Sequence, residues 1–285
     1  MSTAKISAPM FGDRLYQQRA QAALPLLVRQ AKAGKPIFYS DLAEELGMPN
    51  PRNLNYVLGS IGQSMALLSD SWDKKVPPIQ CLVVNRATGL PGEGIGWFLV
   101  KEEDFNALPL RQKRAMIEAE LQHIFSYPYW SDVLAELSLP EVAASQSTIV
   151  AAAARGGFGG GEGTEHKALK LYVARNPAIV GLPPSSAPGV SEHPLPSGDC
   201  LDVSFQHRKI WVAAEVKSSI SSEADIARGL FQCVKYLAVM EAVQIATERP
   251  ANARAVLVLG GPFPPSLITL RNLLGVEVID AVSIK

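Results

Sequence analysis

CLDVSFQHRKIWVAAEVK, residues 200–217, determines how the second half of this chain folds. Two runs rich in β-branched and apolar residues, 200–205 and 210–217, flank the polar segment Gln206-His207-Arg208-Lys209. Apolar runs of this length around a short polar segment predict two strands joined as a β-hairpin. The hairpin brings Asp202, near the start of the first strand, close to Glu215, near the end of the second.

Three side chains of this hairpin, Asp202, Glu215 and Lys217, form a candidate active site. Because strand side chains alternate between faces, Glu215 and Lys217 project from one face while Val216 points into the core. Two carboxylates beside an ammonium group can hold a divalent metal and activate water. A surface hairpin with an ordinary ion pair would show the same residues.

Asp202 and the later Glu215-Val216-Lys217 follow an order that resembles the signature of the PD-(D/E)xK nuclease superfamily. Upstream, the Gly-rich end of a longer segment leads into a predicted helix with Thr164 as its N-cap. The superfamily often carries an acidic residue on this first helix, and Glu165 matches it.

A long amphipathic helix is predicted downstream, from Asp225 to Thr247. Gln232 and Tyr236 are four residues apart on it and share a face, which resembles the Q-xxx-Y element found after the catalytic hairpin in many superfamily members. An ordinary helix surface would give the same pair. A buried strand at 255–260, a helix at 264–274 and a strand at 276–279 complete the pattern.

The fold class that we expect is α/β. The resemblance implies a restriction-endonuclease-like αβββαβ core in residues 163–285, the nuclease domain. A mainly α, winged-helix-like domain in residues 1–140 is expected to precede it and to bind DNA. The Ala- and Gly-rich segment 141–162 is expected to link the two as a hinge.

The resemblance also implies a role for each site residue. Mg²⁺, for which Mn²⁺ would substitute, is expected to be held by Asp202, Glu215 and the carbonyl of Val216. Lys217 would orient the attacking water and offset developing negative charge. The remaining assignments are a second metal or the metal's water shell for Glu165, phosphate or water positioning for Gln232 and Tyr236, and phosphate contacts at the rim of the site for Ser218 and Ser219.

The first domain contains a predicted helix-turn-helix. An amphipathic helix over 13–33 ends at Gly34, and a short helix over 41–46 follows Ser40, the expected N-cap. A second short helix is predicted over 52–63. Three polar residues at the start of this helix are expected to face a DNA groove: Arg52, Asn53 and Asn55.

The segment after this pair predicts a strand at 79–85 and, at 88–94, a Gly/Pro-rich loop of the kind that forms the wing of a winged helix. The progression resembles the DNA-binding part of alkylguanine-DNA alkyltransferases. Gln80-Cys81-Leu82 stands where that family has its Pro-Cys-His-Arg nucleophile motif, so we do not expect alkyl transfer by Cys81. A helix-turn-helix that contacts only protein would share this pattern.

Two further segments have distinctive compositions. Aromatic residues gather between His123 and Trp130, in a helical region interrupted at Pro128. Such a cluster could stack on unpaired bases, but we expect it in a core between the domains. Six prolines in the stretch 176–197 exclude a regular helix and predict a long lid or spacer before the hairpin.

Composition limits the classes of protein. With 285 residues, 47% hydrophobic and 19% charged, the chain predicts one large or two modest globular domains, and we expect two. Basic and acidic residues both number 27, so no overall positive field draws it to nucleic acid and any DNA contact must be local. Its three cysteines lack CxxC spacing, and no apolar run approaches a membrane span. We therefore expect a soluble, cytoplasmic protein without membrane contact.

The function that we expect from these features is a metal-dependent DNA endonuclease, of the restriction or phage-defence type, acting on duplex DNA as a homodimer. The homodimer follows from the resemblance alone. Two alternatives stay open: a noncatalytic DNA-binding or scaffold protein with a nuclease fold, and a nuclease that acts on RNA or branched DNA.

Overall fold

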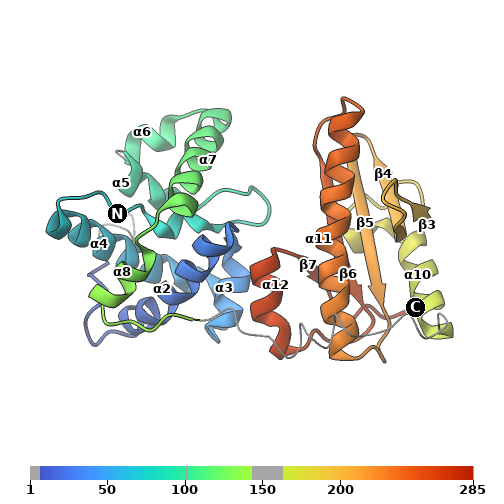
Figure 1. Ribbon diagram of the computed structural model, residues 1–285, viewed down its shortest axis with the longest axis horizontal. Helices are drawn as coiled ribbons and strands as arrows, with labels where there is room; N and C mark the ends of the chain where they lie inside the picture. The colour runs from blue at the N-terminus through green and yellow to red at the C-terminus, as the bar shows by residue number, and fades with distance from the viewer. Residues whose placement is uncertain (1–6, 101, 143–162, 285) are drawn as a thin grey trace. The chain divides into compact units, whose positions relative to one another are not determined.

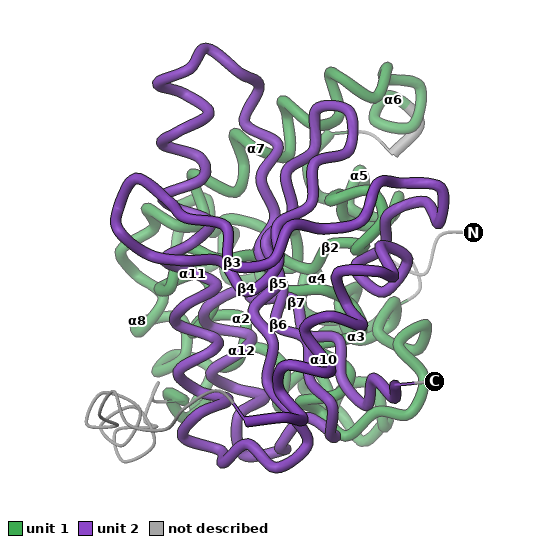
Figure 2. Tube along the Cα trace, turned by 90° about the vertical axis from the view of Figure 1, so that its right-hand side faces the viewer, with its two compact units in different colours: residues 1–144 green, residues 145–285 purple. Residues whose placement is uncertain are grey.

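A computed structural model describes residues 7–100, 102–142 and 163–284. The chain divides into two compact units, residues 1–144 and 145–285, shown in different colours in Figure 2. The division falls within the expected linker at 141–162, of which residues 143–162 lie outside the described part of the chain. In that described part, no helix is both long enough and apolar enough to span a membrane.

The second unit is built on a five-stranded sheet whose strands lie in sequence order. The first two pairings, β3–β4 and β4–β5, are antiparallel, and the next two, β5–β6 and β6–β7, are parallel. The strands are β3 (Val190–Pro194), β4 (Cys200–His207), β5 (Ile210–Lys217), β6 (Ala253–Leu259) and β7 (Glu277–Ile279). The helices are α10 (Thr164–Arg175), α11 (Glu223–Ala246) and α12 (Ile268–Leu274).

Helices α10 and α11 pack against opposite faces of this sheet (Figure 1). On the α10 side, Leu169 and Val173 pack with Val216 of β5. On the α11 side, Leu230 packs with Leu257 of β6. The mixed α/β class is confirmed. The helices and strands of the second unit follow the order α10-β3-β4-β5-α11-β6, which is the expected αβββαβ order, and α12 and β7 come after them.

The hairpin of β4 and β5 lies where the sequence predicts it, with a tighter turn. Gln206 and His207 belong to β4, and the chain reverses at Arg208, whose φ of 53° is left-handed. Two helix starts differ from the prediction. Gly163, not Thr164, occupies the N-cap of α10, and α11 begins at Glu223 because Ser222 forms a capping box with Asp225.

The proline-rich stretch 176–197 is more regular than expected. It contains a 3₁₀ turn, Pro177–Val180, and the strand β3, which pairs with β4 alone at the edge of the sheet. An edge strand tolerates Pro194 because one side of its backbone makes no ladder hydrogen bonds. The stretch holds no α-helix, as predicted, but the edge strand β3 within it was not predicted.

The first unit is mainly helical. Helix α2 (Leu15–Ala33) ends at Gly34, which adopts a left-handed φ of 65°. Helix α3 (Tyr39–Glu45) has Phe38 at its N-cap, so Ser40 lies inside the helix and its hydroxyl donates instead to the Asp41 carboxylate.

Helix α4 (Leu54–Trp72), preceded by a 3₁₀ turn at Pro51–Asn53, is longer than the predicted 52–63. The buried residues of α4 continue as far as Leu68, so the helix extends beyond residue 63 to keep its apolar face packed. The remaining helices are α5 (Gly96–Leu99), α6 (Glu102–Ala107), α7 (Leu110–Ser126) and α8 (Trp130–Glu136).

The expected wing is not formed in the described part of this unit. Most of the predicted strand 79–85 is a 3₁₀ turn, Ile79–Leu82, and only β2 (Val83–Val84) is extended. β2 pairs in parallel with β1 (Ile37–Phe38), and no other described strand joins them. The loop 88–94 follows as a turn and a 3₁₀ segment, Glu93–Ile95, so it is not the tip of an antiparallel hairpin.

The aromatic residues around Pro128 pack inside the first unit. Trp130 is buried in its core and donates from Nε1 to the Ile124 carbonyl at 2.8 Å. The ring of Tyr127 lies 4.8 Å from that of Trp130. Trp130 and the partly buried Tyr127 thus belong to the first unit, whereas His123 and Tyr129 are exposed.

Candidate active site

Asp202 occupies a point where β4 departs from strict alternation. Leu201 belongs to the cluster on the α11 side, whereas Val203 belongs to the cluster on the α10 side. The β4–β5 pairing ends at Val203 and Ala214, and beyond it the Asp202 carboxylate accepts a 2.8 Å hydrogen bond from the backbone N–H of Val216. The side chain therefore takes the place of a backbone partner and is held between the two strands.

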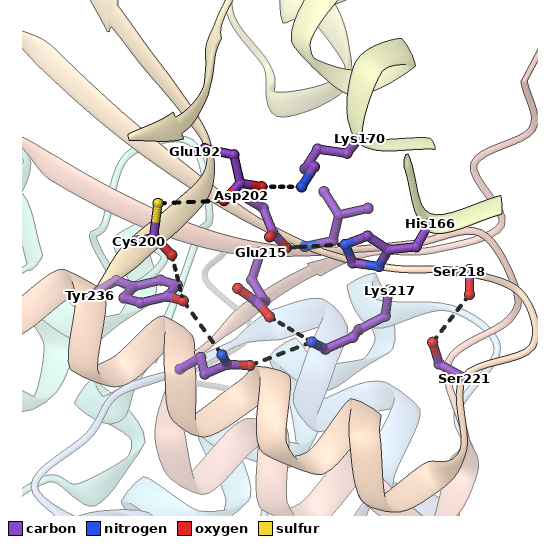
Figure 3. A network of polar contacts seen from close by, with 12 residues as sticks. His166, Lys170, Glu192, Cys200, Asp202, Glu215, Lys217, Ser218, Ser221 and Tyr236 are labelled. Atoms are coloured by element: carbon purple, nitrogen blue, oxygen red, sulfur yellow. Dashed lines mark hydrogen bonds and ion pairs between the residues drawn. The ribbon is translucent and has the colours of Figure 1, made fainter. Parts of the chain in front are cut away.

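Glu215 and Lys217 project together on the α11 side of β5, as the alternation predicts (Figure 3). The Lys217 ammonium donates to Glu215 Oε1 at 2.6 Å. Only 3% of the Glu215 side chain and 15% of the Lys217 side chain are exposed, so this pair is not an ordinary surface ion pair. Val216, which lies between them in the sequence, points to the other face of the sheet and is buried in the core on the α10 side.

The second carboxylate oxygen of Glu215, Oε2, is buried and accepts no hydrogen bond of normal geometry from the described residues, because the Tyr236 hydroxyl, although close enough to lower the pKa of this carboxyl, donates to the Cys200 carbonyl. Burial, and next the charge of Asp202, raise the pKa of Glu215 from 4.5 to about 7, although Lys217 acts in the opposite direction. A buried carboxylate oxygen without a partner is costly, because it loses its water and gains nothing in return. This atom is placed where a further positive group could bind.

The pKa of Asp202 is shifted in the opposite direction to that of Glu215. Burial favours a raised pKa, but the interactions with His166 and the Val216 amide, helped by the charge of Lys217, outweigh it and hold the pKa of Asp202 below its usual value. The two carboxylates thus differ: Asp202 is held in its charged form, whereas Glu215 is at the margin of ionisation near neutral pH.

Helix α11 contributes a chain of polar contacts to this site. Lys217 Nζ lies 3.4 Å from Gln232 Oε1, and Gln232 Nε2 lies 3.4 Å from the Tyr236 hydroxyl. That hydroxyl donates to the Cys200 carbonyl at 3.1 Å. Burial and the nearby acidic groups raise the pKa of Tyr236, so it stays protonated and can donate. Gln232 and Tyr236 therefore join the hairpin to α11.

Gly229 allows α11 to lie this close to the hairpin. A Cβ at that position would lie 2.8 Å from Leu257 Cδ1 and 3.2 Å from Lys217 Cε. Any side chain at Gly229 would press on the stem of Lys217. Gly229 was not among the residues predicted for the site.

Glu165 is less closely connected to the hairpin than expected. It is exposed on α10, and its carboxylate accepts a 3.3 Å hydrogen bond from the Ser219 hydroxyl. No described contact joins Glu165 to Asp202, Glu215 or Lys217. Glu165 contacts the segment that follows β5, through Ser219, and makes no direct contact in the described residues with the two carboxylates.

His166, the next residue, lies close to Asp202 and was not among the predicted site residues. Its Nε2 lies 3.9 Å from Asp202 Oδ2, on the α10 side of the site (Figure 3). Lys170, one helical turn later, is 5% exposed and forms an ion pair with Glu192 of β3. Glu192 also accepts from the Cys200 thiol at 3.5 Å. Four-residue spacing of His166 and Lys170 on one helix was the signal that could have identified this face.

Asp202, Glu215 and Val216 offer oxygen atoms of the kind that a hard divalent cation binds. The N–H and C=O of one strand residue point to the same side, so the Val216 carbonyl faces the side on which its N–H meets Asp202. Two carboxylates and this carbonyl are oxygen ligands of the kind that Mg²⁺ prefers, and Mg²⁺ keeps several waters. No three His, Cys, Asp or Glu side chains in the described ranges form a metal-binding group by themselves. The backbone carbonyl and water would therefore have to complete the coordination.

In the first unit, Arg52, Asn53 and Asn55 are all exposed around the start of α4, while Leu54 between them is buried. Cys81, in contrast, is fully buried, and burial followed by the charge of Glu120 raises the pKa of its thiol. A buried, protonated thiol is a poor nucleophile.

Comparisons with known protein families, with curated proteins and with solved structures find no match for this chain.

Proposed function

We propose that this protein is a metal-dependent nuclease that hydrolyses phosphodiester bonds in DNA. The observation that carries the proposal is the buried Glu215 carboxylate, with one oxygen on Lys217 and the other without a partner, beside the charged Asp202. An ion pair that served only stability would satisfy both oxygens. A carboxylate left half satisfied next to a second carboxylate is an arrangement that a divalent cation completes.

Asp202, Glu215 and the Val216 carbonyl would hold Mg²⁺, or Mn²⁺ in its place, with His166 beside Asp202. When bound, the cation supplies positive charge that offsets the transition state and lowers the pKa of a coordinated water. The protein's own part is to fix the oxygen ligands, to exclude bulk water from Glu215, and to keep the Asp202 carboxylate charged.

Lys217 positions the attacking water and stabilises the negative charge that develops on the phosphate. The Lys217 ammonium donates to the Glu215 carboxylate and lies 3.4 Å from Gln232 Oε1, so the direction of the side chain is fixed before substrate binds. A charged donor held in place in this way costs no reorganisation during the reaction. Gln232 and Tyr236 are positioning residues that hold Lys217 and the start of β4.

Duplex DNA is the substrate that we propose, with the start of α4 as its second contact surface. Arg52, Asn53 and Asn55 are exposed at the N-terminal end of the second helix of a helix-turn-helix, where such helices present side chains to a groove. The equal numbers of basic and acidic residues favour local contacts over a broad positive surface. A restriction or phage-defence role and a homodimer are part of this proposal, because a double-strand break requires two cuts.

The experiment is incubation of the full chain with supercoiled plasmid, linear duplex, single-stranded DNA and RNA, each with Mg²⁺, Mn²⁺, Ca²⁺ or EDTA. We expect cleavage of duplex with Mg²⁺ and Mn²⁺, little with Ca²⁺, and none with EDTA. Lys209→Ala, an exposed lysine in the turn at the other end of the hairpin, is the matched control for Lys217→Ala. Robust hydrolysis in EDTA, or equal loss in both lysine variants, would overturn the proposal. DNA binding without cleavage under any condition would favour a noncatalytic protein.

A further inference from the structure

Helix α10 carries a buried lysine on the side of the sheet that borders the candidate active site. Lys170 lies one helical turn after His166, so both side chains share the face of α10 that meets β3 and β4. Lys170 is buried, and its ammonium forms an ion pair with Glu192 of β3 (Figure 3). A lysine is rarely buried to this degree unless an anion accompanies it. The ammonium of Lys170 therefore marks a place for a negatively charged group.

The carboxylate that fills this place lies at the surface. The side chain of Glu192 is 58% exposed, whereas that of Lys170 is only 6% exposed. In the pair of Arg29 and Glu45, by contrast, both side chains are buried. Because the Glu192 carboxylate is already largely in water, its release from the ammonium costs little desolvation. Glu192 is thus a removable cover over a buried positive charge.

Two features of the strand work against this cover. The pairs of β3 with β4 on either side place Glu192 directly opposite Asp202, and like charges that face each other across two strands repel. The described ladder has no backbone pairing between these two residues, and Glu192 adopts a left-handed φ of 55°. A residue other than glycine takes up this conformation only at a cost. The ion pair with Lys170 therefore holds Glu192 against backbone strain and against the charge of Asp202.

The Cys200 thiol is a second donor at the same place. It donates to Glu192 Oε2 at 3.5 Å, while Lys170 contacts Glu192 Oε1. Burial, and next the hydrogen bond to Glu192, raise the pKa of this thiol, so it stays protonated. The oxygens of a phosphate group can accept from an ammonium and a thiol in the same way. The carboxylate of Glu192 thus occupies a site that suits a phosphate.

We propose that Lys170 binds the DNA phosphate next to the one being cut, and that Glu192 occupies this site until DNA binds. Asp202, which would hold the cation, is the cross-strand neighbour of Glu192. A DNA strand with its scissile phosphate at the cation would therefore bring the adjacent phosphate to Lys170. One anion replaces another on the ammonium, and the Glu192 carboxylate moves into water. This inference rests on the proposed nuclease function and assigns a second phosphate contact to the same site.

The test measures whether Lys170 and one particular phosphate interact. The cut position in a short duplex is mapped with wild type and Mg²⁺, and binding is then measured in Ca²⁺ with a single neutral methylphosphonate at each phosphate around it. Wild type should bind about tenfold more weakly when one phosphate adjacent to the cut is neutral. Lys170→Met should bind the unmodified duplex about tenfold more weakly and lose nothing further at that phosphate. Lys209→Met, an exposed control in the turn of the hairpin, should keep the wild-type pattern.

Glu192→Gln tests the cover. The substitution removes the anion that competes with DNA, so the duplex should bind about tenfold more tightly in Ca²⁺. Glu277→Gln removes a carboxylate from the ion pair with Arg254 on β7, the other edge strand of the sheet, and should bind as wild type. Melting curves establish that each variant is folded. The double variant Lys170→Met with Glu192→Gln has no buried charge to compensate, so it replaces Lys170→Met if that protein is unfolded.

Two results would overturn the phosphate site and leave the nuclease proposal intact. In one, the folded lysine variant loses as much affinity as wild type at every neutral phosphate, so that Lys170 serves only the ion pair. In the other, Glu192→Gln binds the duplex no more tightly than Glu277→Gln. Absence of cleavage by the wild type on every substrate would instead overturn the proposed function, and this inference with it.

Discussion

Two acid–base pairs, one in each unit, are almost equally buried and yet differ in how well they are satisfied. In the first unit Arg29 reaches both oxygens of Glu45, at 2.6 and 2.9 Å, with side-chain exposures of 3% and 10%. In the second, Lys217 reaches one oxygen of Glu215 and leaves the other without a partner in the described residues. Both oxygens of Glu45 are paired, although Arg29 Nε is itself buried without a partner in the described residues, whereas one oxygen of Glu215 is not paired. We therefore take the first pair as structural and propose the free carboxylate oxygen of the second as a place for a cation.

The largest effect should come from breaking the complete pair. Arg29→Ala leaves the Glu45 carboxylate buried without a counter-charge, which should destabilise the first unit by about 3–5 kcal/mol. Urea denaturation measures this change. Replacing both residues with Met should recover most of the loss, since an apolar pair has no charge to compensate. If Arg29→Ala were as stable as the wild type, the pair would not be the closed structural contact described here.

Breaking the incomplete pair should lower the rate, and it should destabilise the fold less than Arg29→Ala does, because Glu215, with a pKa already raised to about 7, can take up a proton once the ammonium is removed. Lys217→Ala removes a preorganised positive charge, so duplex cleavage should fall by about 10²–10³-fold while DNA binding in Ca²⁺ is kept. Single-turnover cleavage and a binding titration check the two parts. A variant that loses binding and cleavage together, or loses neither, would show that Lys217 does not act on the chemical step.

The raised pKa of Glu215 should make the stability of the protein depend on pH. Below the unfolded pKa of 4.5 Glu215 is protonated in both states and carries no penalty. As the pH rises from 4.5 to about 7 the unfolded state ionises first, so stability falls, by roughly 3 kcal/mol in all, and is constant above that range.

Glu215→Gln removes this titration. Without divalent metal, the difference in melting temperature between Glu215→Gln and wild type should therefore shift in favour of the variant between pH 5 and pH 8, and Mg²⁺ should narrow the gap by stabilising only the wild type. Thermal denaturation over that range measures both changes. A difference that is independent of pH would contradict the raised pKa of Glu215.

The smallest effect concerns the first unit's exposed residues. Arg52→Ala should weaken duplex binding evenly across sequences and reduce the slope of log K against log salt by about one ion. A fluorescence-anisotropy titration at several salt concentrations measures it, with Arg175→Ala on α10 as an arginine control outside the first unit. An unchanged slope would remove α4 from the DNA-contacting surface.

The sequence predicted the parts of the site that depend on periodicity. Alternation along β5 placed Glu215 and Lys217 together, and the four-residue spacing on α11 placed Gln232 and Tyr236 on the face that meets them. Short, local patterns of this kind are decided by backbone geometry, so tertiary packing rarely reverses them.

Other parts depend on contacts that the sequence does not display. His166 meets Asp202 only because α10 crosses the strand at that residue, and Glu165 turns towards Ser219 instead. The 3₁₀ turn at Ile79–Leu82 and the strand β3 were missed because a short apolar run is ambiguous and because prolines hide an edge strand. The break in alternation at Asp202 likewise arises from packing on two faces.

Metal binding to the half-satisfied carboxylate is the most direct test of the central claim. Mn²⁺ binding by electron paramagnetic resonance, without nucleic acid, would compare wild type with Asp202→Asn, Glu215→Gln and Lys217→Ala. We predict one ion bound by the wild type and by Lys217→Ala, with affinity lowered at least about tenfold in each carboxylate variant. Equal Mn²⁺ affinity in all four proteins, or no Mn²⁺ bound by the wild type, would contradict a metal site at Asp202 and Glu215.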